Sequence, residues 1–223
     1  MRIEFKTPKG RDCEGSLAVP NTKGKTPGVV LVHEYWGVNA HIVSIAGRLA
    51  EVGFRVLAPD LYHGKITADA SEAGKLMQAL DWHVAVDDIA GAVAHLRAHE
   101  SSNGKVGVMG FCMGGAMSFA AACNVAELAA VVPFYGAPAE KYGDYATVTS
   151  PILAHFSKRD PWAKVELAEA VQKEMQAAGK SMELFTYDAD HAFFNDTRPE
   201  VYSPECAKLA WDRTVAFLRA NLD

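Results

Sequence analysis

The stretch that decides the fold reads Lys105-Val106-Gly107-Val108-Met109-Gly110-Phe111-Cys112-Met113-Gly114-Gly115. Its first five residues, which are uncharged from Val106 onward, are expected to form a strand. Residues 113–123 are expected to form a helix. The stretch from Val106 to Cys123 contains no charged residue and approaches the length of a membrane span. The glycines between 110 and 115 indicate a strand-to-helix turn instead, so we expect a buried strand followed by a buried helix.

Cys112 lies at the centre of that turn. A nucleophile on a tight strand-to-helix turn has a strained backbone and needs small neighbours, and Gly110 and Gly114 lie two residues to either side. The turn also places the sulfur at a helix N-terminus, where backbone N–H groups and the helix dipole favour an anion. Cys112 is therefore the predicted nucleophile. The alternative is a buried structural cysteine in a glycine-rich turn.

Strand-like and helix-like segments alternate along the rest of the chain. Strands are expected at 3–5, 16–19, 28–32, 54–58, 105–109, 129–132, 152–156 and 182–186. Helices are expected between Asn39 as N-cap and Gly53 as stop, at 71–100 with a break near Asp81-Trp82, and at 113–123, 165–178 and 207–218. This alternation is typical of an α/β fold with a mainly parallel sheet covered on both faces. No repeat or linker divides the chain, so residues 1–223 are expected to form one domain.

Composition excludes several classes of function. The 223 residues carry a net charge of −5 and no run of Lys and Arg, which argues against a nucleic-acid partner. The N-terminus has no apolar segment of signal-peptide length. The four cysteines match no metal or redox spacing, and we expect Cys13, Cys123 and Cys206 to be mostly buried small hydrophobes. A cytoplasmic protein without membrane contact follows, and the ordinary composition favours a monomer.

No cofactor is implied by any motif. The chain contains neither a G-x-G-x-x-G pattern nor a P-loop, and Gly37 occupies the second histidine position of the zinc motif that His33-Glu34 would begin. His95 and His99 have helical spacing for a metal pair. With no third ligand in view, they are interpreted as surface residues.

Three reactive residues follow predicted strands in the order nucleophile, acid and base. In a parallel sheet, sites gather at the carboxyl ends of the strands. Cys112 and Asp160 follow two such strands, and His191 comes a few residues after the last one. The histidine could act as general base for the thiol, with the aspartate orienting its imidazole.

Longer stretches around these residues make the pattern specific. They are His33-Glu34-Tyr35-Trp36-Gly37-Val38-Asn39, Ala58-Pro59-Asp60-Leu61-Tyr62, Gly104 to Gly115, and Asp190-His191-Ala192-Phe193. On these residues the chain resembles the dienelactone hydrolases (carboxymethylenebutenolidases), a branch of the α/β-hydrolases. The resemblance implies an α/β-hydrolase fold and a cofactor-free, metal-free hydrolase that acts on a small ester or lactone.

The resemblance also implies a role for each matching position. Cys112 would attack the ester carbonyl, with Asp160 and His191 completing a triad. Glu34 falls where the family has a glutamate that hydrogen-bonds the resting cysteine and shifts on substrate binding to help take the thiol proton. A solvated loop carboxylate is the alternative for Glu34. The remaining implied positions are the oxyanion-hole N–H groups of Met113 and Tyr35, and the pocket aromatics Trp36, Tyr135, Trp162 and Phe193, each of which could equally serve in packing.

The chain departs from the family at the residues that bind an anionic substrate. Asn195 occupies the position of a family arginine, four residues after the catalytic histidine, and the nearest arginine is Arg198. Arg198 could bind substrate from a shifted loop or be a plain surface residue. The region from Ala68 to Lys75, where another family arginine would fall, offers only Lys75 as a cation. These departures put an anionic dienelactone in doubt as the natural substrate.

Two functions of other classes remain open. A non-catalytic relative with this fold could bind a ligand in the same cleft, although such proteins usually lose a triad member and this sequence retains all three candidates. Cys112 could also act as a redox sensor, because exposed thiols of low pKa oxidise readily. No second cysteine is evidently placed to resolve the oxidised form, although spacing alone does not exclude Cys123.

Overall fold

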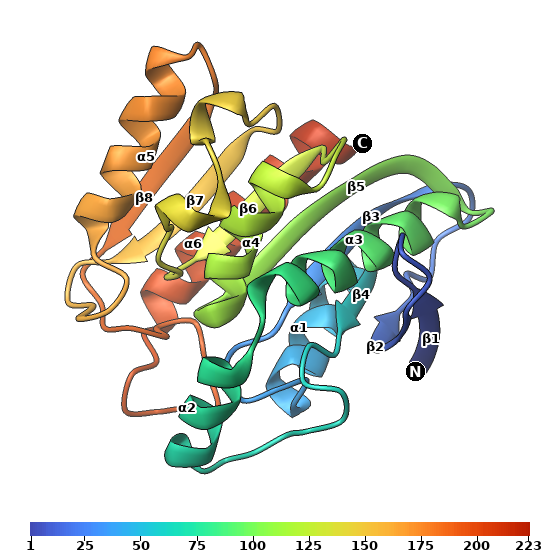
Figure 1. The fold of residues 1–223 in the computed structure, drawn as a ribbon, viewed down its shortest axis with the longest axis horizontal. Coiled ribbons are helices and arrows are strands. Elements are labelled where there is room, and N and C mark those ends of the chain that lie inside the picture. The colour runs from blue at the N-terminus through green and yellow to red at the C-terminus, as the bar shows by residue number, and fades with distance from the viewer.

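The computed structural model describes residues 1–223 and contains one eight-stranded sheet with the order β1-β2-β4-β3-β5-β6-β7-β8 (Figure 1). The pairs β1–β2 and β2–β4 are antiparallel, and all other neighbouring strands are parallel. The strands are β1 (Arg2–Lys6), β2 (Asp12–Ala18), β3 (Thr26–Val32), β4 (Arg55–Pro59), β5 (Ser102–Phe111), β6 (Ala130–Phe134), β7 (Ile152–Ser157) and β8 (Met182–Tyr187). The expectation of a mainly parallel sheet in an α/β fold is confirmed.

Six α-helices and two short 3-10 helices connect the strands. They are α1 (Ala40–Glu51), α2 (Ala70–Ala79), α3 (Trp82–Ala98), α4 (Met113–Asn124), α5 (Val165–Ala177), α6 (Pro204–Leu222), η1 (Glu140–Tyr142) and η2 (Tyr145–Thr147). The predicted break near Asp81 is confirmed, since α2 ends at Ala79 and the side chain of Asp81 caps α3 through the N–H of His83. The two 3-10 helices were not expected from the sequence.

The helices cover both faces of the sheet. Helices α1 and α6 lie on one face, and α3, α4 and α5 lie on the other (Figure 1). Strand β5 shows why both faces must be covered, because its side chains alternate between two apolar cores. Val106 and Val108 belong to the core on the α3 and α4 side, whereas Met109 and Phe111 belong to the core on the α1 and α6 side.

The uncharged stretch from Val106 to Cys123 forms a buried strand and a buried helix, as expected. No helix has both the length and the apolar character required to cross a bilayer.

All four cysteines are free thiols. The expectation of burial is confirmed for Cys13, whose thiol donates a hydrogen bond of 2.7 Å to Asp88 Oδ1. Cys123 and Cys206 are partly buried and pack against the two apolar cores, which agrees with their interpretation as small hydrophobes.

Helix α2 is attached to the rest of the molecule differently from the others. It lies outside the two helical layers, below the first turn of α4 in the view of Figure 1. Ala73 is its only buried residue, whereas α4 buries nine. The residue Met77 on α2 nevertheless contributes to the wall of the main cavity described below. Helix α2 therefore shapes the cavity while contributing little apolar burial to the fold.

Helix α1 begins at a side-chain cap that the sequence predicts. Asn39 Oδ1 accepts a hydrogen bond of 3.1 Å from the N–H of Ile42, and Gly53, with φ of 107°, follows the end of the helix.

We expect Asn39→Ala to lower the free energy of unfolding by about 1 kcal/mol in urea denaturation, because an N–H of the first turn loses its partner. Ser203 caps α6 without a side-chain hydrogen bond, so Ser203→Ala is the matched control and should change stability by only a few tenths of that amount. Equal losses of unfolding free energy in Asn39→Ala and Ser203→Ala would contradict the role of the Asn39 side chain as a helix cap.

Candidate active site

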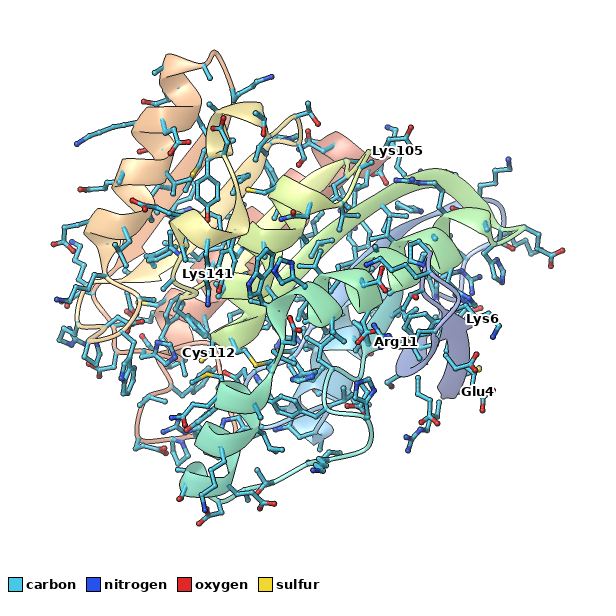
Figure 2. All side chains as sticks on the ribbon, in the orientation of Figure 1. Glu4, Lys6, Arg11, Lys105, Cys112 and Lys141 are labelled. Atoms are coloured by element: carbon cyan, nitrogen blue, oxygen red, sulfur yellow. The ribbon has the colours of Figure 1, made fainter.

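The predicted reactive residues meet at the carboxyl edge of the sheet. Cys112 directly follows β5, Asp160 follows β7, and His191 follows β8. Figure 2 places Cys112 at the end of α4 that faces α2. A cavity of about 590 Å³ opens at this edge, and Cys112 and His191 both line it. The parallel order of β5, β6, β7 and β8 therefore brings together residues that are far apart in the sequence.

Cys112 lies on a strained turn between β5 and α4. Its φ of 54° and ψ of −115° lie in a region that residues with side chains rarely adopt. The turn forms only because its glycines leave space: a Cβ at Gly110 would lie 2.2 Å from the carbonyl oxygen of Gly114, and one at Gly114 would lie 2.3 Å from that of Val32. The predicted turn is thus present, with Cys112 as the N-cap residue of α4.

Asp160 and His191 form a short hydrogen bond. The Nδ1–H of His191 donates to Asp160 Oδ2 at 2.5 Å, and Asp160 is 7% exposed. The other carboxylate oxygen, Oδ1, accepts from the backbone N–H groups of Trp162 at 2.8 Å and Ala163 at 2.9 Å. With Nδ1 holding the proton, the Nε2 atom of His191 is the nitrogen left to exchange a proton with other groups.

The thiol of Cys112 is held in its protonated form. Burial, followed by the negative charge of Glu34, raises the pKa of Cys112 to about 12. The backbone N–H groups of Met113 and Tyr35 act in the opposite sense and lower this pKa, as expected for groups that could stabilise an anion at this point. No hydrogen bond joins the sulfur to His191, so the cysteine in this arrangement is not an activated thiolate.

Glu34 is buried beside the cysteine but binds a different residue. It is 1% exposed, and its Oε2 accepts a hydrogen bond of 2.6 Å from Asn195 Nδ2. Thr197 donates twice to Asn195 Oδ1, at 3.1 Å from its N–H and 2.7 Å from its hydroxyl, which points the amide NH₂ toward Glu34. Burial raises the pKa of Glu34 to about 7, against the smaller effects of Asn195 and Arg198. The solvated-carboxylate alternative is therefore wrong, and the hydrogen bond to Cys112 that the resemblance implies is not formed.

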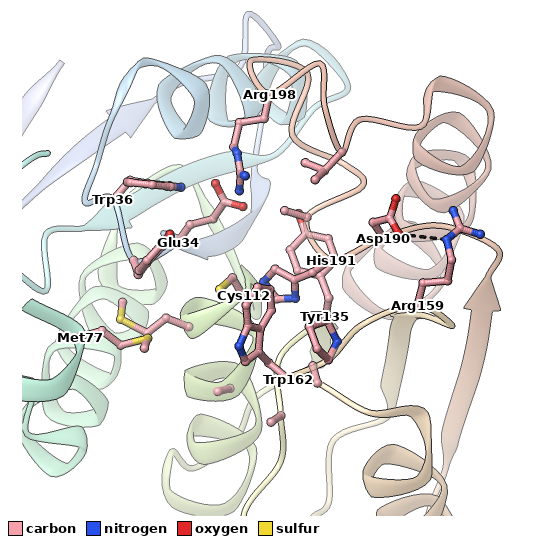
Figure 3. Close-up of a pocket in the computed structure, with 18 residues that line it drawn as sticks. Glu34, Trp36, Met77, Cys112, Tyr135, Arg159, Trp162, Asp190, His191 and Arg198 are labelled. Atoms are coloured by element: carbon pink, nitrogen blue, oxygen red, sulfur yellow. Dashed lines mark hydrogen bonds and ion pairs between the residues drawn. The ribbon is translucent and has the colours of Figure 1, made fainter. Parts of the chain in front are cut away.

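Three of the four predicted pocket aromatics line the cavity. Trp36, Tyr135 and Trp162 are among its lining residues (Figure 3). Phe193 is not, and its assignment to the pocket is wrong. Ala192 has a left-handed φ of 65°, and Phe193 is fully buried against Tyr187 and Tyr135, with ring centroids 4.9 and 5.5 Å away.

Two arginines reach the cavity, and they differ in how far their charge is neutralised. Arg159 pairs with both Asp188 and Asp190. Arg198 pairs only with Glu200, at 2.8 Å, and its guanidinium carbon lies 5.9 Å from the ring centroid of Trp36. Figure 3 shows the Arg198 guanidinium pointing toward the carboxyl group of Glu34. Lys75, the other candidate cation, is exposed on α2 and does not line the cavity.

The weaker histidine candidates take structural positions. His33 is fully buried, and its Nε2 accepts a hydrogen bond from the N–H of Leu61 at 3.2 Å. His95 packs its ring 6.1 Å from that of Phe5, so it is not simply a surface residue. No group of three or more His, Cys, Asp or Glu side chains is arranged to hold a metal ion.

Some site residues could not be identified from the sequence. In the sequence Asn195 stands out only because a family arginine is absent there, yet it is the sole hydrogen-bond partner of the Glu34 carboxylate. Arg159 stands immediately before Asp160, and this adjacency was the available signal for its place in the pocket wall. Met77 carries no signal of its own, because nothing in the sequence shows where α2 lies.

A family model, related sequences and solved structures all match this chain over most of its length. The model of the dienelactone hydrolase family matches residues 13–222. Protein usf of Aquifex pyrophilus is 34% identical, covering 99% of this chain and 98% of its own length. A probable 2-oxo-3-(5-oxofuran-2-ylidene)propanoate lactonase of a Bradyrhizobium species is 33% identical, and the match covers 92% of this chain and 88% of the lactonase. The crystal structure of a putative dienelactone hydrolase from Klebsiella pneumoniae superposes with a TM-score of 0.87 at 26% identity, covering 98% of both chains.

The raised pKa of Glu34 predicts how stability depends on pH. A carboxyl group that titrates at about 7 in the folded protein and near 4.5 in the unfolded chain leaves the folded state holding more protons between these values. Stability should therefore fall as pH rises from about 4.5 to about 7, by on the order of 3 kcal/mol for this group. In Glu34→Gln this fall in stability with rising pH should be absent from thermal or urea denaturation. The exposed control Glu183→Gln should show the same pH dependence of stability as wild type. Superimposable pH curves for wild type and Glu34→Gln would refute the assignment.

Proposed function

Because the chain belongs to the dienelactone hydrolase family and is a carboxylic ester hydrolase, we propose that it cleaves a small ester or lactone with Cys112 as nucleophile and with Asp160 and His191 completing a triad. The main support for this proposal is one observation. The 2.5 Å hydrogen bond between His191 Nδ1 and Asp160 Oδ2 leaves the second imidazole nitrogen available in the cavity that Cys112 lines from its strained turn. The whole chain acts as one domain, since a single sheet carries all of these residues.

Acylation begins when Cys112 loses its thiol proton to His191. The thiolate attacks the carbonyl carbon of the substrate, a C–S bond forms, and the carbonyl oxygen becomes an oxyanion. The backbone N–H groups of Met113 and Tyr35 stabilise that oxyanion. The bond from carbon to the alkoxy oxygen then breaks, and the imidazolium of His191 gives its proton to the departing oxygen.

Hydrolysis of the thioester repeats these steps with water. His191 takes a proton from a water molecule, the hydroxide oxygen attacks the thioester carbon, and the C–S bond breaks. The acid product leaves, and the thiol of Cys112 recovers a proton from His191. Asp160 holds the imidazole in position throughout and stabilises its charged form. No metal or cofactor is needed to balance these steps.

Glu34 links substrate binding to thiol activation. In the resting arrangement the carboxyl group is held by Asn195, and its negative charge raises the pKa of Cys112. A substrate that displaces Glu34 from Asn195 moves the carboxylate toward the thiol, where it helps to take the proton. Because the resting thiol is protonated, it is also protected from the oxidation that a free thiolate would undergo.

The pocket favours a neutral and partly apolar substrate. Twelve of the eighteen lining residues are hydrophobic, and the volume of about 590 Å³ lies in the range of small-molecule sites. Asn195 brings no charge to the position beside Glu34. Arg198 is the pocket cation with a single carboxylate partner, and we assign to it the binding of a carboxylate where a substrate carries one. The free thiols suit a reducing compartment, and we infer a cytoplasmic location.

Substitution of the triad tests the mechanism. With p-nitrophenyl acetate and a panel of lactones, we expect Cys112→Ala and His191→Ala to lower kcat/KM at least about a thousandfold, because these residues act as a unit. Cys112→Ser should also be much slower, since the site is arranged for a thiol. A ligand-binding protein without catalytic activity would give no turnover above background in wild type, and full activity in Cys112→Ala would disprove the mechanism.

The two pocket arginines provide a test of substrate charge. We expect wild type to prefer a neutral lactone to a lactone of similar size that carries a carboxylate. Arg198→Gln should lower kcat/KM for the carboxylate-bearing lactone about tenfold, the effect of losing a charged hydrogen bond, and leave that for the neutral lactone within twofold. Arg159→Gln is the matched control, because two aspartates already neutralise its charge. If both variants affect both substrates equally, Arg198 has no specific role.

A further inference from the structure

Tyr135 has a strained backbone at the edge of the candidate site. It directly follows β6, and its φ of 35° lies in the left-handed region that tyrosine rarely occupies. Its N–H donates a hydrogen bond of 2.7 Å to the carbonyl oxygen of His155, which holds the turn in place. The side chain is thereby fixed in the wall of the cavity that contains Cys112 and His191.

The hydroxyl of Tyr135 has no partner within the protein. The residue is fully buried, and its hydroxyl oxygen makes no hydrogen bond. Three other buried tyrosines differ: Tyr62 donates to Met113 Sδ, Tyr145 donates to Ala139 O, and Tyr187 is bonded to His155. An unpaired buried hydroxyl destabilises a fold, and phenylalanine would pack in the same space without this loss. Packing alone therefore does not account for a tyrosine at this position.

The surroundings of the hydroxyl make it a hydrogen-bond donor. Burial raises the pKa of Tyr135 well above its ordinary value, and the charges of Glu34 and Cys112 raise it further, so the O–H keeps its proton. The ring edge packs on His191, with centroids 5.1 Å apart at 62°. Figure 3 shows Tyr135 beside His191 among the residues that line the cavity.

Two oxygens of a bound ester require donors during the reaction, and one of them is already supplied. The carbonyl oxygen faces the N–H groups of Met113 and Tyr35. The alkoxy oxygen lies toward His191, because it takes its proton from that residue when the C–O bond breaks. Two aromatic side chains pack against His191: Tyr135 and Trp162, with ring centroids 5.1 and 5.0 Å away. Trp162 is 70% exposed, whereas Tyr135 is buried and its hydroxyl donor is unused.

Resting on the function proposed above, we propose that the Tyr135 hydroxyl donates a hydrogen bond to the alkoxy oxygen of the bound ester or lactone and so makes the enzyme selective for oxygen esters over thioesters. Tyr135 keeps its own proton: the C–O bond breaks, the proton that ends on the leaving oxygen comes from His191, and the hydroxyl stabilises the charge that builds on that oxygen. A thioester presents sulfur at the same point. Because divalent sulfur is a weak acceptor, a thioester gains little from this donor.

The test compares phenyl acetate with S-phenyl thioacetate in wild type, Tyr135→Phe and Cys112→Ala, together with thermal denaturation of each protein. We expect Tyr135→Phe to lower kcat/KM for the oxygen ester about tenfold and to change that for the thioester by less than twofold. The Tm of Tyr135→Phe should stay the same or rise by about 2–4 °C, because an unpaired polar group is removed. Tyr145→Phe is the control: its hydroxyl is bonded within the protein and remote from the cavity, so its Tm should fall while both rates are unchanged.

The possible outcomes separate this proposal from the one on which it rests. A fall in the Tm of Tyr135→Phe would show an internal partner for the hydroxyl and would overturn the proposal. Equal losses on both substrates, or no loss on either, would overturn it as well while leaving a Cys112-dependent hydrolase in place. If wild type hydrolyses the oxygen ester no faster than Cys112→Ala, the thiol mechanism itself fails, and the role of Tyr135 fails with it.

Discussion

The arrangement of the site depends on the direct backbone contact of helix α4 with the ends of two strands. A Cβ at Gly114 would lie 2.3 Å from the carbonyl oxygen of Val32, and one at Gly136 would lie 2.1 Å from the N–H nitrogen of Ala116. Only glycine permits this approach. The segments that leave β3 and β6 are thereby pressed against the first turn of α4. Glu34 and Tyr35 on one segment and Tyr135 on the other are consequently placed around Cys112, and the strain at Cys112 is one cost of that arrangement.

The electrostatics of the resting site follow from the same close packing. Glu34 is enclosed with a single hydrogen-bond donor, and that donor is the neutral amide of Asn195. Without a cation in direct contact, burial is the dominant effect on the carboxyl group, and its pKa rises to about 7. The thiol of Cys112 shares this environment and stays protonated. A ligand that changes the contacts of Glu34 therefore changes the charge that the sulfur experiences, which couples occupancy of the pocket to reactivity.

Much of the fold was predictable because strand and helix periodicities are local. The buried run before Gly110 and the glycines around Cys112 are sufficient to predict β5, the turn and α4. Asp160 and His191 were also predictable as neighbours, since parallel strands end at one edge. Side-chain direction was not: Phe193 was placed in the pocket, and the left-handed backbone of Ala192 precedes its burial in the core instead. The pairing of Glu34 with Asn195 depends on the loop after β8, and no local pattern records it.

The limited burial of helix α2 affects which substitutions this protein can tolerate during evolution. Its only fully buried residue is Ala73, with Leu76 partly buried against the core, and yet it contributes Met77 to the cavity wall. Substitutions on its remaining surface alter the shape of the cavity while disturbing few buried contacts, so most of them fall within the range that a marginally stable protein tolerates. Most residues in β5 and α4 have no such freedom, because they are buried in the core. Substitutions in α2 can therefore reshape the cavity at a smaller cost in stability than substitutions in the sheet or in the turn that carries the sulfur.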